Sequence, residues 1–266
     1  MRVGIIGGGF MGEAFLRGLL RAEVAAPAEV AVADLSATRR TALTKHGVRV
    51  TDDAESVCIS AEVVLIAVKP QDFETAAQGL RGAISTSAVL ISIAAGIRLA
   101  EVQRDTGHHA SVRVMPNLPA AIGEGAIVYH AASDLSAAQR ETMQRVMSAV
   151  ATVVVEVEDD DTVDLATAVH GSGPAYIYMV AESMIEAAVR LGMKRSDAQR
   201  LVLSTVAGSA RYALGSEMTP TELRYAVTSP GGTTAAAIAE LETAGLRAAF
   251  GDAIEAAYAR AQELGE

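Results

Sequence analysis

The fold is decided near the start of the chain, where residues 2–20 read RVGIIGGGFMGEAFLRGLL. A short apolar run ends at Ile6, a G-x-G-x-x-G motif follows, and apolar residues then recur at helical spacing. In such a strand–turn–helix unit Gly7 permits a tight turn, Gly9 lets the backbone approach a pyrophosphate, and Gly12 allows the helix to pack closely on the strand. The N–H groups at the start of the helix attract phosphate oxygens. The stretch therefore predicts a dinucleotide-binding turn.

Strand-like and helix-like segments alternate through the first 160 residues. The apolar run VVLIAV at residues 63–68 is continuous, as expected of a central strand that helices cover on both faces. Ser36 and Ser136 each precede a helical pattern and are expected N-caps. This alternation predicts an α/β fold with a doubly wound, parallel, Rossmann-type sheet. The predicted strands lie at residues 3–6, 29–33, 48–50, 63–68, 89–93, 112–115, 126–129 and 153–157.

The pattern changes after residue 160. Strand-like runs stop, and Ala, Leu, Glu and Met recur at helical spacing, with predicted helices over residues 175–190, 195–214 and 234–263. We therefore divide the chain into a dinucleotide-binding domain, residues 1–160, and an all-helical domain, residues 161–266. The helical domain is rich in apolar residues for its size, which predicts burial against another subunit. The acidic string at residues 158–161 is expected to be a solvated linker and helix start.

Composition excludes several classes of protein. The 266 residues carry 32 acidic and 22 basic side chains, a net charge of −10, so no nucleic-acid partner is expected. The longest uncharged stretches, residues 82–97 and 165–181, are broken by Gly, Ser or Pro, so no membrane span is expected. The lone Cys58 is interpreted as an inert core thiol, and no metal site is assigned. The first residues lack the pattern of a signal peptide, which predicts a cytoplasmic protein.

Further candidate residues follow predicted strands, where ligands of such sheets bind. Lys69 lies in the stretch AVKP after one strand, and Asn117 lies in the rigid stretch RVMPNLP after another. Asp34 ends the second strand and suits the ribose hydroxyls of NAD, whereas Arg39 and Arg40 suit the 2′-phosphate of NADP. Both nucleotides therefore remain open at this point.

Two glycine-rich turns lie in the helical half, at residues 170–176 (HGSGPAY) and 229–234 (SPGGTT). The second leads directly into a predicted helix. Successive backbone N–H groups at such a turn form an anion cradle that fits a carboxylate, and Thr233 and Thr234 add hydroxyl donors.

These motifs, in this order and over essentially the whole length, resemble the pyrroline-5-carboxylate reductase family. The resemblance implies reduction of 1-pyrroline-5-carboxylate to L-proline, the last step of proline biosynthesis, with NADPH as the hydride donor and NADH possible. It also implies a helical domain that binds substrate and interlocks with a partner subunit, in a homodimer or a ring of dimers.

The motifs and the resemblance together assign site residues. Thr234 is the expected catalytic residue, as hydrogen-bond partner or proton donor to the ring nitrogen. His170, Asp34 and Ala54 depart from the family pattern, which usually has serine, a small hydroxyl residue and asparagine there. The expected cofactor-binding residues are Ile6, Gly7, Gly8, Gly9, Phe10, Met11, Gly12, Asp34, Arg39, Ala67, Val68, Lys69, Pro70, Ala94, Ala95, Gly96, Met115, Pro116 and Asn117. The expected substrate-binding residues are His170, Ser229, Pro230, Gly231, Gly232, Thr233 and Thr234.

Two alternatives remain open on the sequence. One is another imine reductase or a β-hydroxy-acid reductase with the same two-domain plan. The other is a non-catalytic dimer that senses NAD(P). The turn at residues 229–234 favours a reductase, because a sensor has no need of an anion cradle facing the nicotinamide.

Overall fold

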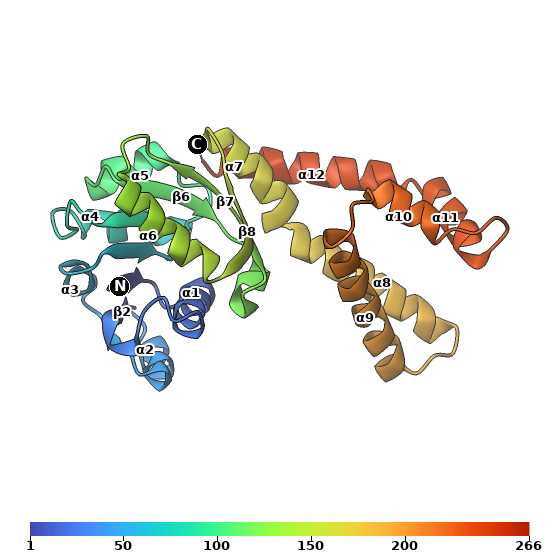
Figure 1. The fold of residues 1–266 in the computed structure, drawn as a ribbon, viewed down its shortest axis with the longest axis horizontal. Coiled ribbons are helices and arrows are strands. Elements are labelled where there is room, and N and C mark those ends of the chain that lie inside the picture. Colours follow the sequence, from blue (N-terminus) through green and yellow to red (C-terminus); the bar gives the residue numbers. More distant parts are fainter. Residues whose placement is uncertain (266) are drawn as a thin grey trace. The chain divides into compact units, whose positions relative to one another are not determined.

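The computed structural model describes residues 1–265, which form two compact units (Figure 1). The sheet unit comprises Met1–Ser172 together with the end of the chain from Ala257, and the helical unit comprises Gly173–Ala256. The predicted boundary after residue 160 falls at the start of helix α7 (Asp160–Ala166), which groups with the sheet unit. The division of the chain at residue 160 stays a prediction.

The sheet unit contains one eight-stranded sheet in the order β3-β2-β1-β4-β5-β6-β7-β8. Every predicted strand run overlaps one of these strands. The first six strands are parallel and follow the strand order of dinucleotide-binding folds. The strands are β1 (Val3–Ile6), β2 (Val30–Ala33), β3 (Arg49–Thr51), β4 (Val63–Ile66), β5 (Val89–Ser92), β6 (Ser111–Met115), β7 (Gly125–Ala131) and β8 (Ala151–Glu156).

One strand departs from the predicted parallel arrangement, because β7 runs antiparallel to β6. A parallel neighbour needs a crossover of about a dozen residues or more. The connection between these strands contains only a 3-10 turn at Leu118–Ile122. It is too short to bring the chain back to the edge of the sheet where β6 begins. The next connection contains helix α6 (Ala137–Ser148), and β8 is accordingly parallel to β7.

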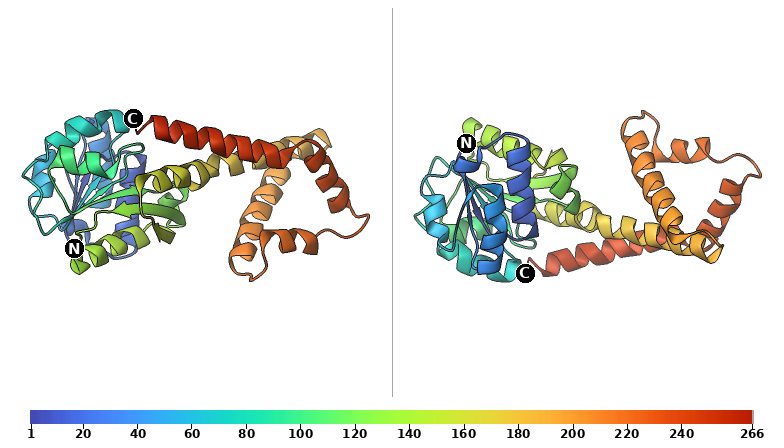
Figure 2. Two further views of the ribbon diagram at one scale, coloured as in Figure 1. Left: turned by 90° about the horizontal axis from the view of Figure 1, so that it is seen from above. Right: turned by 90° about the horizontal axis from the view of Figure 1, so that it is seen from below.

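Helices cover both faces of the sheet (Figure 2). Both predicted N-caps are confirmed, since the side chains of Ser36 and Ser136 each accept a hydrogen bond from a backbone N–H three residues on. The helices of the sheet unit before α6 are α1 (Phe10–Arg21), α2 (Ala37–Leu43), α3 (Ala54–Cys58), α4 (Pro70–Gln78) and α5 (Leu99–Thr106).

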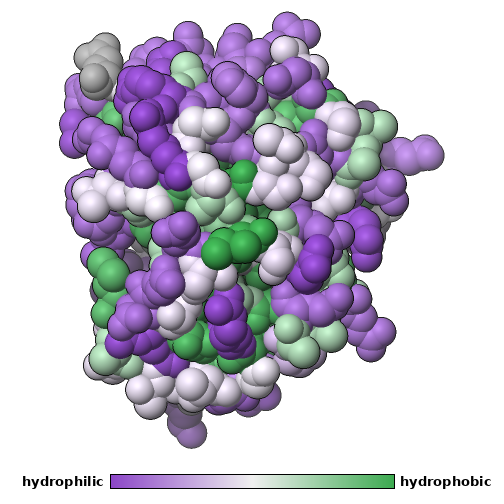
Figure 3. Space-filling model, turned by 90° about the vertical axis from the view of Figure 1, so that its left-hand side faces the viewer, coloured by the Kyte–Doolittle hydropathy of each residue, from purple (hydrophilic) through white to green (hydrophobic). Residues whose placement is uncertain are grey.

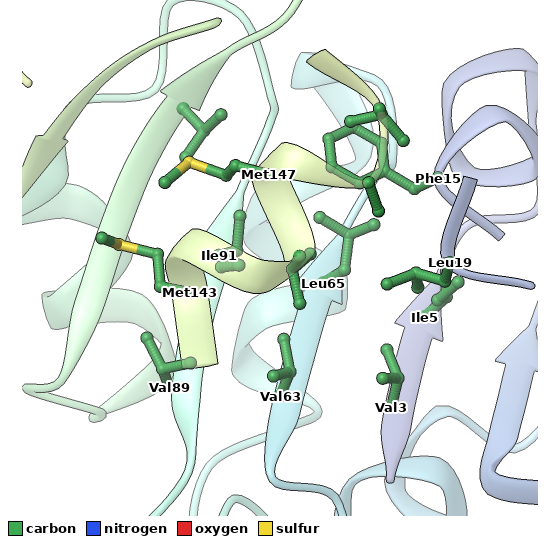
Figure 4. Packing of buried hydrophobic residues seen from close by; sticks show 14 of the residues in the cluster. Val3, Ile5, Phe15, Leu19, Val63, Leu65, Val89, Ile91, Met143 and Met147 are labelled. Atoms are coloured by element: carbon green, nitrogen blue, oxygen red, sulfur yellow. The ribbon is translucent and has the colours of Figure 1, made fainter. Parts of the chain in front are cut away.

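The central strand β4 shows why its sequence is continuously apolar. Val63 and Leu65 pack on the face that carries Phe15 of α1 and Met147 of α6 (Figure 4). The alternate residues of β4 pack on the opposite face, with Phe73 of α4. The outside of the unit is different: in the view of Figure 3 hydrophilic side chains cover most of the surface.

Cys58 lies at the end of α3 and is fully buried. Burial, with the nearby carboxylates of Glu55 and Asp53, raises the pKa of its thiol to about 12. The side chain therefore stays protonated at neutral pH and behaves as a small apolar group.

The helical unit departs from the predicted helix over residues 234–263. That segment is two helices, because the chain turns at Gly245, whose φ of +75° favours glycine. A short helix at Pro220–Ala226 was also not predicted. The helices are α8 (Gly173–Arg190), α9 (Arg195–Leu214), α10 (Pro220–Ala226), α11 (Thr233–Thr243) and α12 (Leu246–Glu263), the last of which ends in the sheet unit.

The helical unit has little core of its own. Its buried apolar residues are Ala181, Ala198 and Val202. Large apolar side chains are exposed instead, among them Met179 at 70% and Leu214 at 82%. Surface of this kind marks a protein–protein contact. No helix within residues 1–265 combines the length and apolar character that crossing a bilayer requires.

A buried ion-pair cluster fastens the start of α7 to the sheet. Arg113 of β6 is 3% exposed, and its guanidinium contacts the Asp164 carboxylate, which is 1% exposed. Arg113 also lies 3.1 Å from the Asp160 carboxylate, which His130 of β7 approaches to 3.3 Å. The expectation that the whole acidic string is solvated is therefore wrong for Asp160, whose side chain compensates a buried cation. Asp159, by contrast, caps α7 as expected of a helix start.

We expect Arg113→Leu to lower the free energy of unfolding by about 3–5 kcal/mol, because it leaves the buried Asp164 carboxylate without its cation. Urea unfolding followed by circular dichroism measures the loss. The matched control is Arg140→Leu, which removes an exposed 2.8 Å pair with Glu156 and should cost less than about 1 kcal/mol. Equal losses in the two variants would contradict the assigned role of the buried cluster.

Candidate active site

The glycine turn after β1 has the geometry that its sequence predicts. Gly7 has a φ of +96°, and a Cβ there would lie 2.7 Å from the carbonyl oxygen of Ala67. A Cβ on Gly12 would lie 2.0 Å from the carbonyl oxygen of Gly7, so α1 packs directly on the turn. A Cβ on Gly9 would meet no described atom within 4 Å. The turn is therefore packed closely against the backbone at Gly7 and Gly12, whereas it is open to solvent at Gly9.

The start of α1 is open to an anion. Gly9 is its N-cap, and no side chain among the described residues caps the first turn. The N–H groups of a first turn have no partner within their own helix. These groups and the positive end of the helix dipole can therefore bind phosphate oxygens.

The carboxylate of Asp34 holds the glycine turn to the end of β2. One oxygen accepts a hydrogen bond from the Gly8 N–H at 2.8 Å, and the other accepts one from the Ser36 N–H at 2.8 Å. Arg39, which was expected to bind the cofactor, donates to the Gly8 carbonyl and to the carboxylate of Glu13, the latter at 2.8 Å. Asp34 and Arg39 therefore hold the two backbone polar groups of Gly8, its N–H and its carbonyl.

Glu13 was not singled out from the sequence, yet its carboxylate pairs with three basic side chains beside the turn. Its carboxylate lies 3.0 Å from the His46 ring, 3.1 Å from the Lys45 ammonium and 2.8 Å from Arg39. The hydrogen bond with His46, opposed by burial and reinforced by Arg39 and Lys45, lowers the pKa of Glu13 to about 2. Glu13 is thus ionised at neutral pH and fixes the position of Arg39.

A cavity of about 550 Å³ opens beside the turn, within the range of about 300–1,000 Å³ typical of ligand pockets. Several expected cofactor residues line it, namely Ile6, Gly7, Gly9, Asp34, Ala67, Val68 and Lys69. Ala54 lines it as well, and so do residues that sequence analysis missed, namely Ala33, Leu35, Asp52, Asp72, Thr75, Ala76 and Gly79.

The remaining expected cofactor residues lie outside that lining. Gly8 is buried in the turn and Gly12 is buried in α1. Phe10 and Met11 lie in the first turn of α1, and Pro70 opens α4. Ala94, Ala95 and Gly96 follow β5, and Met115, Pro116 and Asn117 end or follow β6. Both strands are parallel to β1, so these segments lie at the same edge of the sheet as the cavity.

The segment after β6 is fixed by side-chain contacts. Asn117 accepts a hydrogen bond from the Ala126 N–H at 2.9 Å and donates to the carbonyl of His170 at 3.3 Å. The ring of His170 in turn lies between the carbonyl oxygens of Ala166 and Met115. His170 belongs to a π-helical turn, Thr167–Gly171, which overlaps the start of the glycine-rich stretch at residues 170–176.

The turn at residues 229–234 forms a second anion-binding geometry, in the helical unit. Gly231 has a φ of +71°, and the Gly232 N–H donates to the Ser229 carbonyl at 3.1 Å. Gly232 is the N-cap of α11, and no described side chain caps it. Thr233 is exposed and Thr234 is half-buried in the first turn of this helix. The backbone N–H groups there are suited to a carboxylate.

No group of three or more His, Cys, Asp or Glu side chains with a geometry for metal binding occurs within residues 1–265.

A matched pair of glycine variants tests the first site. Gly9→Ala should leave the free energy of unfolding within about 0.5 kcal/mol of wild type, because a Cβ there meets open space. It should weaken NADPH binding at least about tenfold, or about 1.4 kcal/mol, because the methyl group occupies the approach to the turn. Gly12→Ala should instead cost about 1–3 kcal/mol of stability. Fluorescence titration and urea unfolding measure these effects, and unchanged affinity in Gly9→Ala would remove Gly9 from the binding site.

Comparison with known proteins agrees on one family. Residues 160–264 match the family model described as pyrroline-5-carboxylate reductase dimerisation, and residues 2–96 match the model described as NADP oxidoreductase coenzyme F420-dependent. The pyrroline-5-carboxylate reductase of Synechocystis is 40% identical, covering 100% of this chain and 99% of that protein.

Solved structures extend the agreement to the fold. A pyrroline-5-carboxylate reductase from Coxiella burnetii has a TM-score of 0.91 at 34% identity, covering 100% of this chain and 98% of that one. The Plasmodium falciparum pyrroline carboxylate reductase with NADP bound has a TM-score of 0.90 at 26% identity, covering 100% and 98%. The chain therefore belongs to the pyrroline-5-carboxylate reductase family.

Proposed function

We propose that the protein reduces 1-pyrroline-5-carboxylate to L-proline with NADPH, and that NADH can replace NADPH. The observation that carries this proposal is the pairing of two uncapped helix starts in one chain. One follows the glycine turn of a dinucleotide fold, and the other follows the turn at residues 229–234. Relatives that match this chain over nearly their full length are named pyrroline-5-carboxylate reductases.

The residues present fit a dinucleotide. Gly9 is open, the first turn of α1 lacks a side-chain cap among the described residues, and the neighbouring cavity reaches Asp34 and Lys69. The turn would hold the pyrophosphate, and residues 94–96 and 115–117 would line the nicotinamide side. A family relative has been solved with NADP bound. When bound, the reduced nicotinamide supplies the hydride.

The substrate needs an anion site and a hydroxyl near its ring nitrogen. In the proposal Ser229, Gly231, Gly232 and Thr233 bind the carboxylate through backbone N–H and hydroxyl groups. Thr234 donates a hydrogen bond to the nitrogen while the imine carbon receives the hydride. The imine can enter already protonated, so a hydroxyl suffices and no strong acid is needed. Rate then depends on alignment of the reacting atoms to within about 3–3.5 Å.

The proposal includes self-association, as a homodimer or a ring of dimers. Its support is the match of residues 160–264 to a dimerisation family model and the exposed apolar side chains of the helical unit. The expected cytoplasmic location stays a prediction.

Steady-state kinetics with different substrates test the reaction itself. We expect NADPH oxidation with 1-pyrroline-5-carboxylate and much slower oxidation with pyrroline-2-carboxylate. We expect no oxidation of β-hydroxy acids in the reverse assay. A preference for either of the other substrates would overturn the proposed reaction.

Thr234→Ala should lower kcat/KM by about 10- to 100-fold, or about 1.4–2.7 kcal/mol, because it removes the donor to the ring nitrogen. Thr234→Ser keeps a hydroxyl and should retain most of the activity. The control is Thr243→Ala at the other end of α11, where the hydroxyl only donates to the Ala239 carbonyl at 2.8 Å. Wild-type kcat/KM in Thr234→Ala would remove Thr234 from the mechanism.

Asp34→Asn should raise the ratio of kcat/KM for NADPH to that for NADH by about tenfold. A carboxylate at the end of the second strand repels a 2′-phosphate, and neither Arg39 nor Arg40 is among the described residues that line the cavity. The control is Asp72→Asn, an equal change of charge at a lining residue on α4, which should leave the ratio unchanged. Equal shifts in both variants would indicate a general effect of charge.

A further inference from the structure

The residues that follow α12 pack directly on the turn that follows β5. Gly96 in that turn is buried and has a φ of +77°. A Cβ on Gly96 would lie 2.7 Å from the carbonyl oxygen of Leu264 and 2.9 Å from its Cβ. A Cβ on Gly265 would in turn lie 3.1 Å from the Gly96 carbonyl oxygen. The two backbones are therefore in direct contact, and Gly96 has no room for a side chain.

Leu264 and Gly265 are fixed to the helix that they follow. The Leu264 N–H donates to the Arg260 carbonyl at 3.2 Å, and the Gly265 N–H donates to the Gln262 carbonyl at 2.9 Å. Leu264 is 48% exposed, so the rest of its surface is covered by neighbouring residues. The contact with Gly96 is thus made by an ordered helix end.

The turn after β5 has little to hold it from within. Residues 93–98 lie outside the strands and helices. The hydrogen bond that closes the turn, from the Ile97 N–H to the Ala94 carbonyl, is long at 3.4 Å. The conformation of the turn therefore depends on contacts from other parts of the chain.

The start of α7 supplies some of these contacts. The Leu99 N–H donates to the Asp160 carboxylate at 3.1 Å. The Arg98 guanidinium donates to the Asp161 carboxylate at 2.7 Å. Both hydrogen bonds act on residues just beyond Gly96, whereas α12 acts on Gly96 itself. Two segments that are distant in sequence, α7 and α12, thus hold the same turn.

We propose that Leu264 and Gly265 are positioning residues, which hold residues 94–96 in the conformation that receives the nicotinamide. This inference rests on the proposed function, because that function places the nicotinamide side of the cofactor at residues 94–96. Loss of the contact loosens the turn and lowers the affinity for the nicotinamide half of the cofactor. The adenosine half is unaffected, because it binds beside Asp34 at the end of β2.

Leu264→Gly tests the contact, because it removes the Cβ that lies against Gly96 and weakens the last turn of α12. In the full-length protein without substrate, it should weaken NADPH binding about three- to tenfold, a factor expected for residues in contact. It should leave the affinity for adenosine 2′,5′-bisphosphate unchanged, because this nucleotide lacks the nicotinamide half. Fluorescence titration measures the first affinity and isothermal titration calorimetry the second. Leu264→Met keeps the Cβ and a similar volume, and it should bind both nucleotides like wild type.

The matched control is Glu263→Gly, which changes the neighbouring residue in the same way. It has a similar loss of helix propensity but removes only an exposed carboxylate, which pairs with Arg260 at 2.6 Å. Its NADPH affinity should equal that of wild type. Wild-type NADPH affinity in Leu264→Gly, or an equal loss in the two glycine variants, would overturn the proposal. A matching loss of affinity for the adenosine bisphosphate would overturn it as well, because the contact would then support the whole unit.

A second measurement needs no cofactor and separates this inference from the proposed function. Amide hydrogen exchange of residues 94–98, without ligand, should be at least about threefold faster in Leu264→Gly than in Glu263→Gly, because local opening of the turn costs less free energy. Equal exchange rates in the two variants would refute the positioning contact. Failure of wild type to bind NADPH or to turn over 1-pyrroline-5-carboxylate would instead refute the proposed function, and it would leave the difference in exchange rates in place.

Discussion

Close packing of α1 on the turn after β1 is the constraint on which the cofactor end of the molecule depends. The helix can begin where it does only because residue 12 has no side chain, since a Cβ would lie 2.0 Å from the Gly7 carbonyl oxygen. This contact fixes the axis of α1 relative to the parallel strands. The first turn of α1 has no side-chain cap among the described residues, and a Cβ on its N-cap Gly9 would meet open space. Backbone sterics, more than any charged side chain, therefore shape the candidate anion site.

Charged side chains act mainly by bracing the backbone. Asp34 accepts a hydrogen bond from the Gly8 N–H, and Arg39 donates one to the Gly8 carbonyl. Glu13 in turn accepts a hydrogen bond from Arg39. Elsewhere Arg113 fastens α7 to β6 and β7 through Asp160 and Asp164. Asp34 and Arg39 were expected to bind the cofactor, and in the structure both also hold the backbone of the turn. In the proposed function the contacts to ligands are left to backbone N–H groups, hydroxyl groups and the ends of strands.

Most of the fold could be predicted from the sequence because the strands, helices and glycine turn are determined by residues that are close together in the chain. Continuous apolar runs such as that of β4 follow from burial on both faces, and the glycine spacing follows from the tight turn. The direction of β7 was wrong because it depends on the length of one connection, and the helix over residues 234–263 was wrong because a single left-handed glycine divides it. Residues of α4 in the cavity, and the burial of Asp160, depend on contacts distant in sequence. Residues of the candidate site that follow strands can therefore be predicted from the sequence, whereas those that line the cavity from a helix cannot.

The buried thiol of the sheet unit gives the chain an internal reporter. Cys58 is the only cysteine of the 266 residues, and it is fully buried beside the packed strands with a pKa of about 12. Alkylating reagents react with an exposed thiolate, so labelling of the native chain must wait until this region opens. The rate of modification thus reports how often the sheet unit opens around Cys58, without any engineered probe.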